Sequence, residues 1–292
     1  MRNDIKPAWI KVKALSEDCY KAITDISKKY NLNTVCQSAL CPNINECWSA
    51  GTATFLLMGD ICARNCRFCS VKTGDPQGRL NNYEPLNIAK AVQELNLDYV
   101  VLTSVDRDDL EDGGSGHIAT TIKEIKKIND KISVEALIPD FAGNINALKK
   151  VICANPDVIG HNIETVERLS PKIRDKKASY RQSLDILKAV KEINPEIIIK
   201  SSLLLGFGET EPEIKKTLLD LKEHNVDIVT LGQYLRPSKK QLPVVEYIKP
   251  EKFKEYEDYA ENLGFLYVIS TPLARSSFMA GKYFKQACAK RE

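Results

Sequence analysis

From about residue 50 onward, the chain alternates between short apolar runs and segments with helical spacing. Strands of a parallel sheet that is covered on both faces are apolar throughout, so such runs are typical of buried parallel strands. Their starts lie about 25 to 45 residues apart, which is the spacing of strand–helix units. Seven runs fit this description: 54–58, 99–103, 132–138, 157–160, 197–205, 226–231 and 265–269.

Between these runs, apolar residues recur every three or four positions in 118–128, 184–193 and 214–221, which predicts amphipathic helices. Pro212 suits the first turn of the last of them. Alternating strands and helices predict an α/β fold with a parallel sheet covered on both faces. Six or seven such units fit a full or partial βα-barrel. A doubly wound sheet is the alternative, and periodicity alone does not separate the two.

Charge and composition exclude several classes of function. The 292 residues carry 42 Lys and Arg against 39 Asp and Glu, a net charge of +3, which gives no support to a nucleic-acid stripe or a polybasic membrane patch. No run of 18 apolar residues predicts a membrane span, and residues 1–15 lack the apolar core of a secretory signal. We therefore expect a cytoplasmic protein, in which cysteines serve as metal ligands or catalysts rather than disulfides.

Six of the nine cysteines fall between positions 36 and 69, and the other three (Cys19, Cys153 and Cys288) are scattered and are assigned no role. Cys62, Cys66 and Cys69 form a C-x3-C-x2-C triplet directly after the first predicted strand. In βα-barrels the loops at this end of the strands carry the active site. Three thiolates on one loop can hold three irons of a [4Fe–4S] cluster and leave the fourth iron open. A zinc site completed by a distant histidine is the alternative.

A second triplet precedes the first strand. Cys36, Cys41 and Cys47 lie in twelve residues, within a Pro- and Asn-containing loop that restricts the chain. Three cysteines so close to another triplet favour a second three-cysteine [4Fe–4S] site over chance.

The triplet with Phe68 before its last cysteine resembles the radical S-adenosylmethionine superfamily signature. The whole arrangement resembles the lipoyl synthase family from about residue 34 to residue 281. The segments that carry this resemblance are CPNINECW at 41–48, CRFCSVKTG at 66–74, TSVDRDDLEDGG at 103–114, HNIETV at 161–166, YRQSL at 180–184, GFGET at 206–210, LGQYL at 231–235 and RSSF at 275–278.

The resemblance implies a partial (β/α)6-type TIM barrel over residues 51–264. It would be preceded by an N-terminal extension (1–50) that carries the first cysteine loop and followed by a C-terminal extension (265–292). It implies two [4Fe–4S] clusters, S-adenosyl-L-methionine as cofactor, and insertion of two sulfur atoms at C6 and C8 of an octanoyl group bound to a carrier-domain lysine. Cys62, Cys66 and Cys69 would hold the radical-generating cluster. Cys36, Cys41 and Cys47 would hold an auxiliary cluster that donates the sulfur.

Two such clusters need eight ligands, and six cysteines supply six. S-adenosylmethionine would complete the first cluster. By resemblance, Ser277 would complete the second, with Ser276 as the less favoured candidate and Arg275 as its neighbour in the same motif. Taken alone, Arg275 to Ser277 also fits a helix N-cap. An alkoxide is a harder and weaker iron ligand than a thiolate, which suits a cluster that must be dismantled.

Polar residues at predicted strand ends are candidates to bind S-adenosylmethionine. They are Ser104, Asp112, Gly113, Gly114, Asn162, Glu164 and Lys200. The segment 206–210 resembles a phosphate cradle and equally fits a loop-to-helix turn. Phe278 and Gln241 stand where the family pattern leads us to expect tyrosine and histidine, which puts details of substrate contact in doubt.

The implied partners are octanoylated lipoyl carrier domains, of the glycine cleavage H protein or of 2-oxoacid dehydrogenases. An electron donor such as flavodoxin or ferredoxin and an iron–sulfur carrier for cluster rebuilding are also implied, without nucleic acid or membrane. Three alternatives stay open: a biotin-synthase-like sulfur inserter, a two-cluster electron carrier with four cysteines per cluster, and a zinc-stabilised barrel.

Overall fold

An eight-stranded sheet organises the protein in a computed structural model that describes residues 6–10, 17–38, 41, 43–49 and 52–291. Its strand order is β1-β2-β5-β6-β7-β8-β9-β10. All seven predicted strands are confirmed, and each is parallel to its neighbour. They are β2 (Thr52–Leu57), β5 (Tyr99–Ser104), β6 (Ser133–Leu137), β7 (Val158–Gly160), β8 (Ile198–Leu205), β9 (Ile228–Gln233) and β10 (Tyr267–Ser270).

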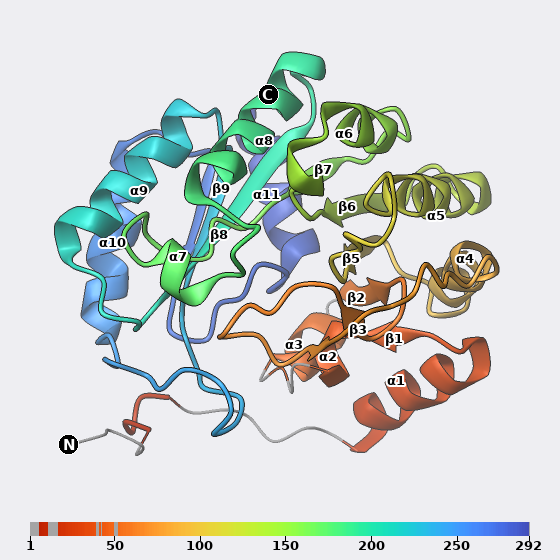
Figure 1. Cartoon of the computed structure of the whole chain (residues 1–292), viewed down its shortest axis with the longest axis horizontal. Coiled ribbons are helices and arrows are strands. Elements are labelled where there is room, and N and C mark those ends of the chain that lie inside the picture. The colour runs from red at the N-terminus through yellow and green to blue at the C-terminus, as the bar shows by residue number, and fades with distance from the viewer. Residues whose placement is uncertain (1–5, 11–16, 39–40, 42, 50–51, 292) are drawn as a thin grey trace.

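The parallel strands follow one another in chain order, without the reversal that a doubly wound sheet requires, so the prediction of a barrel is confirmed. The barrel is partial, because no pairing joins β10 to β1 or β2 among the described residues. Helices surround the sheet (Figure 1). They are α4 (Glu84–Glu94), α5 (Ser115–Ile128), α6 (Ile145–Ile152), α7 (Ser170–Ile173), α8 (Tyr180–Ile193), α9 (Glu211–Glu223) and α10 (Pro250–Asn262), with a 3-10 turn, η1 (Phe141–Gly143).

Local sequence explains where these helices begin. Ser179 caps α8 by accepting a hydrogen bond from the backbone N–H of Gln182. Thr210 and Glu213 form a reciprocal capping box at the start of α9, and Pro212 lies in its first turn, as predicted. Each cap satisfies backbone donors that the helix leaves unpaired, and so fixes the loop between a strand end and the next helix.

The range predicted as a C-terminal extension, 265–292, takes part in the barrel. It contains β10, which extends the sheet by one strand, and the last helix, α11 (Ala280–Arg291). α11 lies at the centre of the ring, beside β5, whereas the other helices lie around the outside (Figure 1). The rings of Phe284 and Tyr99 are 5.5 Å apart, and a Cβ at Gly281 would come within 2.8 Å of Tyr99. This close packing explains why a glycine faces the sheet there.

The predicted loop around Cys36, Cys41 and Cys47 contains short helices, and it follows a longer helix and a short strand. α1 (Glu17–Tyr30) is followed by β1 (Asn33–Thr34), which pairs antiparallel with β2, and by α2 (Val35–Ser38) and α3 (Ile44–Ser49). α2 and α3 both contact β2 at the open side of the barrel. Residues 11–16 of the predicted N-terminal extension lie outside the described residues. Over the described part of the chain, no helix is long and apolar enough to cross a membrane.

Candidate active site with two cysteine triplets

The second triplet lies on a loop that leaves the carboxyl end of β2. Met58 and Gly59 turn the chain there with φ of 65° and 89°. The loop then forms a small parallel pair between β3 (Ile61–Cys62) and β4 (Lys72–Thr73). This pairing closes the segment that contains Cys62, Cys66 and Cys69, so all three cysteines are held on one loop at the active-site end of the barrel.

The three thiols have the environment that an iron–sulfur cluster needs. Backbone N–H groups of Asp106 and Asp175 point at Sγ of Cys62 and Cys66, each at 3.3 Å. Burial raises the pKa of Cys62 to about 11 and that of Cys66 to about 12, and it also raises the pKa of Cys69. The chain alone therefore disfavours the thiolates, and a bound cationic centre is what would stabilise them.

None of the six clustered cysteines is in a disulfide. No group of three His, Cys, Asp or Glu side chains among the described residues lies close enough to hold a single metal ion. A four-iron cluster distributes its ligands over several irons and so accepts wider spacing. His161 lines a cavity together with Cys66, and both of its ring nitrogens are engaged, with the Ile138 carbonyl and the Ser183 hydroxyl. The donor set therefore fits an iron–sulfur cluster better than zinc.

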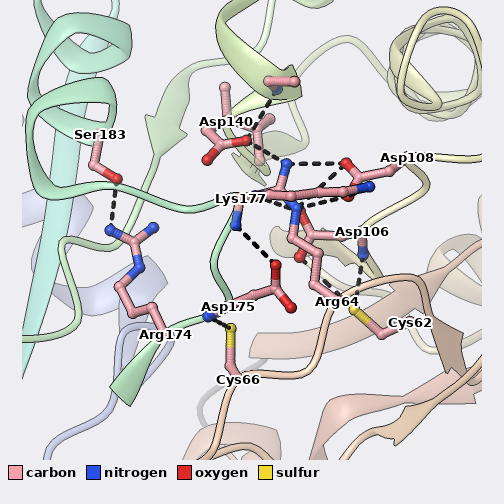
Figure 2. Close-up of polar contacts among 12 residues, drawn as sticks. Cys62, Arg64, Cys66, Asp106, Asp108, Asp140, Arg174, Asp175, Lys177 and Ser183 are labelled. Atoms are coloured by element: carbon pink, nitrogen blue, oxygen red, sulfur yellow. Dashed lines mark hydrogen bonds and ion pairs between the residues drawn. The ribbon is translucent and has the colours of Figure 1, made fainter. Parts of the chain in front are cut away.

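A buried arginine anchors this loop to the next two strand ends (Figure 2). The guanidinium of Arg64 lies 2.7 Å from Asp140, 2.9 Å from Asp108 and 3.4 Å from Asp106. Although burial opposes the charge, hydrogen bonds to Asp140 and Asp108 raise the pKa of Arg64. Burial raises the pKa of Asp106 to about 6 despite this cation. The sequence did not predict this hub, although the acidic run 106–112 contains two of its carboxylates.

A cavity of about 150 Å³ opens beside the triplet, at the carboxyl ends of β5, β6 and β7. Cys66 and Phe68 line it together with three predicted cofactor contacts, Ser104, Asn162 and Glu164. Glu164 has φ of 68°, in the region that non-glycine residues rarely adopt, and burial raises its pKa. Backbone strain of this kind is concentrated at functional sites, where the surrounding structure holds it.

The other predicted cofactor contacts are not among the residues that line this cavity. The Asp112 carboxylate accepts hydrogen bonds from the N–H groups of Gly114 and Gly116 and so caps α5. Gly113 and Gly114 form the turn before that helix, with φ of 60° and 83°. The placement of all three is explained by helix capping.

Lys200 lies inside the barrel, where its ammonium pairs with the buried carboxylate of Glu135 at 3.0 Å. The Tyr99 hydroxyl donates to the same carboxylate at 2.7 Å. A lysine in an otherwise apolar strand needs a partner for its charge, and here that partner is Glu135. A contact between Lys200 and the cofactor stays a prediction.

The first triplet meets the C-terminal motif at the open side of the barrel. The backbone N–H of Met279 donates to Sγ of Cys47 at 3.4 Å, and this thiol in turn donates to the carbonyl of Ser277 at 4.0 Å. Nearby, the Asn43 amide donates to the carbonyl of Leu273 at 2.7 Å. Residues 230 positions apart in the sequence are thus brought together through the Ser277 backbone, and the ligand role of the Ser277 side chain stays a prediction.

These cysteines also need a compensating positive charge. Burial raises the pKa of Cys47 to about 12, and it raises the pKa of Cys41 against the opposing effect of the Arg275 cation. Burial lowers the pKa of Arg275 itself. Arg275 therefore lies close enough to influence the Cys41 thiol, and the donor set again fits a cluster.

Two further sequence features have structural explanations. The N–H groups of Gly206 and Phe207 bind the carboxylate of Glu209, which fills the suspected phosphate cradle with the chain's own anion. Gln241, one of the two departures from the family pattern, donates to the Cys69 carbonyl at 3.1 Å. Gln241 therefore supports the cysteine loop. Phe278, the other departure, packs against Tyr283.

Comparisons with known proteins agree with this geometry. The model of the Radical SAM superfamily matches residues 56–221. The lipoyl synthase of Methanocella arvoryzae is 53% identical over 97% of this chain and 96% of its own length. The lipoyl synthase of Thermus thermophilus is 50% identical over 97% of this chain and 87% of its own length. The mitochondrial lipoyl synthase of Drosophila willistoni is 53% identical over 95% of this chain and 76% of its own length.

Solved structures support the fold. The FeFe-hydrogenase maturase of Carboxydothermus hydrogenoformans has a TM-score of 0.57 at 14% identity, over 94% of this chain and 78% of that protein. A methylornithine synthase has a TM-score of 0.55 at 11% identity, over 91% of this chain and 82% of that protein.

Partial barrel, first-strand cysteine triplet and superfamily match together define a radical S-adenosylmethionine enzyme. Within that class, the chain belongs to the lipoyl synthase family. It is accordingly a sulfurtransferase that uses S-adenosylmethionine and [4Fe–4S] clusters.

Proposed function

We propose that Cys62, Cys66 and Cys69 hold the radical-generating cluster, and that Cys36, Cys41 and Cys47 hold the auxiliary cluster with Ser277 as fourth ligand. The observation that carries the second assignment is the contact of Cys47 with the backbone of Ser277 and Met279. When bound, the clusters and S-adenosylmethionine supply the radical and the sulfur for insertion at C6 and C8 of a protein-bound octanoyl group.

The chain itself contributes position and exclusion of water. Ser104, Asn162 and Glu164 line the cavity beside Cys66, and we assign them to S-adenosylmethionine. The Asn162 amide donates to Glu164 at 3.1 Å, which leaves the second carboxylate oxygen free to accept from an ammonium or ribose hydroxyl. C–H bonds of an acyl chain are too inert for acid–base catalysis, so a dry and well-aligned site matters most.

Each of the three parts of the chain would then have a distinct role. Residues 1–50 would carry the auxiliary-cluster cysteines, residues 51–264 most of the radical barrel, and residues 265–292 the Arg275–Ser277 ligand motif. Placing the auxiliary cluster at the open side of the barrel would let its sulfur reach the acyl chain. Arg275 would stabilise the anionic ligands around Cys41.

The partners follow from the same chemistry. The substrate is carried on lipoyl carrier domains, and we propose those of the glycine cleavage H protein or of 2-oxoacid dehydrogenases. A cytoplasmic flavodoxin or ferredoxin would supply the electrons. An iron–sulfur carrier would rebuild the sacrificed cluster after each turnover.

The test is a single-turnover reaction of the anaerobically reconstituted protein with S-adenosylmethionine, a reductant and an octanoylated peptide. We expect 5′-deoxyadenosine and a peptide that has gained two sulfur atoms. Formation of 5′-deoxyadenosine without sulfur on the peptide would refute the substrate assignment.

The serine assignment is tested by a matched pair, Ser277→Ala and Ser276→Ala. Only Ser277→Ala should lose sulfur insertion while it keeps the spectrum of the radical cluster. Full sulfur insertion by Ser277→Ala would exclude Ser277 as the ligand, and loss confined to Ser276→Ala would transfer the role to Ser276.

A further inference from the structure

Two chain segments form hydrogen bonds with Arg67, in the loop that carries Cys62, Cys66 and Cys69. The first segment is the end of α7 and the residues after it. Its Ile173 carbonyl accepts from the Arg67 backbone N–H at 2.8 Å, and its Lys172 carbonyl accepts from the Arg67 guanidinium at 3.1 Å. From the second, residues 236–242, Leu242 donates to the Arg67 carbonyl at 3.1 Å. Arg67 therefore marks the centre of a surface formed by three segments: 65–72, 171–177 and 236–242.

This surface is strongly positive. Five exposed cations occupy it, and we call them the basic collar: Arg67, Lys172, Lys176, Lys239 and Lys240. No ion pair involves any of them among the described residues, whereas the neighbouring Lys177 is paired with Asp108 at 3.1 Å. The whole chain has a net charge of only +3, so this concentration reflects placement and not composition.

Acidic side chains are nearly absent from the same three segments. Their one carboxylate, Asp175, accepts hydrogen bonds from the backbone N–H groups of Asn65 and Lys177 and is partly buried. The collar cations therefore keep their full attraction for an external anion. A positive patch of this kind raises the rate of encounter with a negatively charged protein.

The cysteine loop separates the collar from the cavity. Cys66 and Phe68 line the cavity, while Arg67 between them is exposed and is not part of the lining. A protein docked on the collar would thus lie against the outer side of the loop that carries Cys66 and Cys69. It would approach the cluster from the side of the loop that faces away from the cavity assigned to S-adenosylmethionine.

We propose that the basic collar is the docking surface for an anionic electron-donor protein. One electron passes from the donor to the cluster held by Cys62, Cys66 and Cys69, so the donor is oxidised by one electron and the cluster reduced by one, with no bond made or broken. The inference rests on the proposed role of these three cysteines. The carrier domain is the competing occupant, and its arm needs the cavity side instead.

The test measures cluster reduction and needs no sulfur insertion. In reconstituted full-length protein, Lys172, Lys176, Lys239 and Lys240 are replaced together by Glu. Reduction of the radical cluster is followed by electron paramagnetic resonance with reduced flavodoxin as the donor, at low ionic strength. We expect the rate to fall by at least about tenfold and to lose most of its salt dependence. Photoreduced deazariboflavin, a small uncharged reductant, should reduce the variant as fast as the wild type.

In a matched control, four exposed lysines elsewhere on the protein are replaced by Glu, which gives the same change in net charge. They are Lys90, Lys131, Lys149 and Lys285. Its reduction by flavodoxin should stay within about twofold of wild type. Equal slowing of control and collar variants, or wild-type rates in the collar variant, would overturn the proposal. So would an unchanged flavodoxin rate with a raised KM for octanoylated carrier, since the collar would then bind the carrier.

A second variant has Gln at the same four collar lysines and guards against misfolding after charge reversal. Its rate of reduction by flavodoxin should fall as well, but by less than in the Glu variant. Wild-type flavodoxin rates in a folded Gln variant would contradict the proposal. Failure of the wild type to bind a reducible cluster at all would instead refute the proposed role of Cys62, Cys66 and Cys69. The two failures are therefore distinguishable.

Discussion

The backbone N–H of Asp175 donates a hydrogen bond to Sγ of Cys66 at 3.3 Å, although the two residues are 109 positions apart. The Asp175 side chain secures this contact by accepting from the N–H of Asn65 at 2.9 Å. Figure 2 shows the pair beside the Arg64 hub. Hydrogen bonds to ligand sulfurs stabilise the more negative, reduced state of a cluster and raise its reduction potential. The segment after α7 therefore influences both the position and the redox properties of the proposed radical cluster.

We predict that Asp175→Ala gives a more negative cluster potential than Asp175→Asn. Both variants remove the same charge, but Asn keeps an oxygen that can accept from Asn65. Losing about 1 kcal/mol of N–H···S stabilisation corresponds to roughly 40 mV for one electron. Redox titration monitored by electron paramagnetic resonance measures the difference. Identical potentials in the two variants would show that the anchor has no effect on the cluster.

Replacement of Arg64 should be costly because it removes the cation that pairs with the buried carboxylate of Asp140. The side chains of Arg64 and Asp140 are 3% and 0% exposed, so Arg64→Leu should destabilise the protein by about 3–5 kcal/mol. Arg64→Lys keeps the charge, loses the forked geometry and should be intermediate. The matched control is Arg168→Leu, which breaks an exposed pair with Glu213 and should cost at most about 1 kcal/mol. Urea unfolding measures all three, and an equal loss for Arg64→Leu and Arg168→Leu would contradict the hub.

His161 should make stability depend on pH. Burial, with the nearby Arg174 cation, lowers the pKa of His161 to about 4, below the ordinary value of 6.5. The unfolded chain therefore binds a proton between pH 6.5 and 4 that the folded protein does not, so stability falls as pH falls through this window. The loss attributable to His161 is about 2 kcal/mol between pH 7.5 and pH 5. Unfolding free energies of wild type and His161→Gln at both pH values check this, and the variant should show a correspondingly smaller loss. An equal pH effect in both proteins would argue that His161 is not the titrating group.

Gly114 and Gly78 form a pair that separates crowding from backbone strain. Both have positive φ, 83° and 66°, so alanine is strained at either position. A Cβ at Gly114 would overlap the Met58 sulfur, while no atom of the described residues lies within 4 Å of one at Gly78. We expect Gly78→Ala to cost about 1 kcal/mol and Gly114→Ala about 1–3 kcal/mol more. Thermal unfolding of the two variants compares them, and equal losses would mean that Met58 gives way freely.

The sequence by itself determined the parallel α/β architecture, because continuous apolar runs and helical spacing are local patterns that burial imposes. It also identified both cysteine triplets, since ligands carried on one loop keep their spacing in the sequence. The motif at 275–278 was found through family resemblance, and the structure places it against Cys47.

Only the tertiary structure decided which distant groups meet. The Arg64 hub joins three strand ends, the Lys200–Glu135 pair crosses the barrel interior, and Asp175 reaches Cys66 from another loop. The structure shows that Asp112, Gly113 and Gly114 form the turn that caps α5, and a turn that binds a ligand uses the same residue types, so their cofactor role stays a prediction. Such contacts depend on how loops at neighbouring strand ends converge in space, and the spacing of residues along a single chain does not record that convergence.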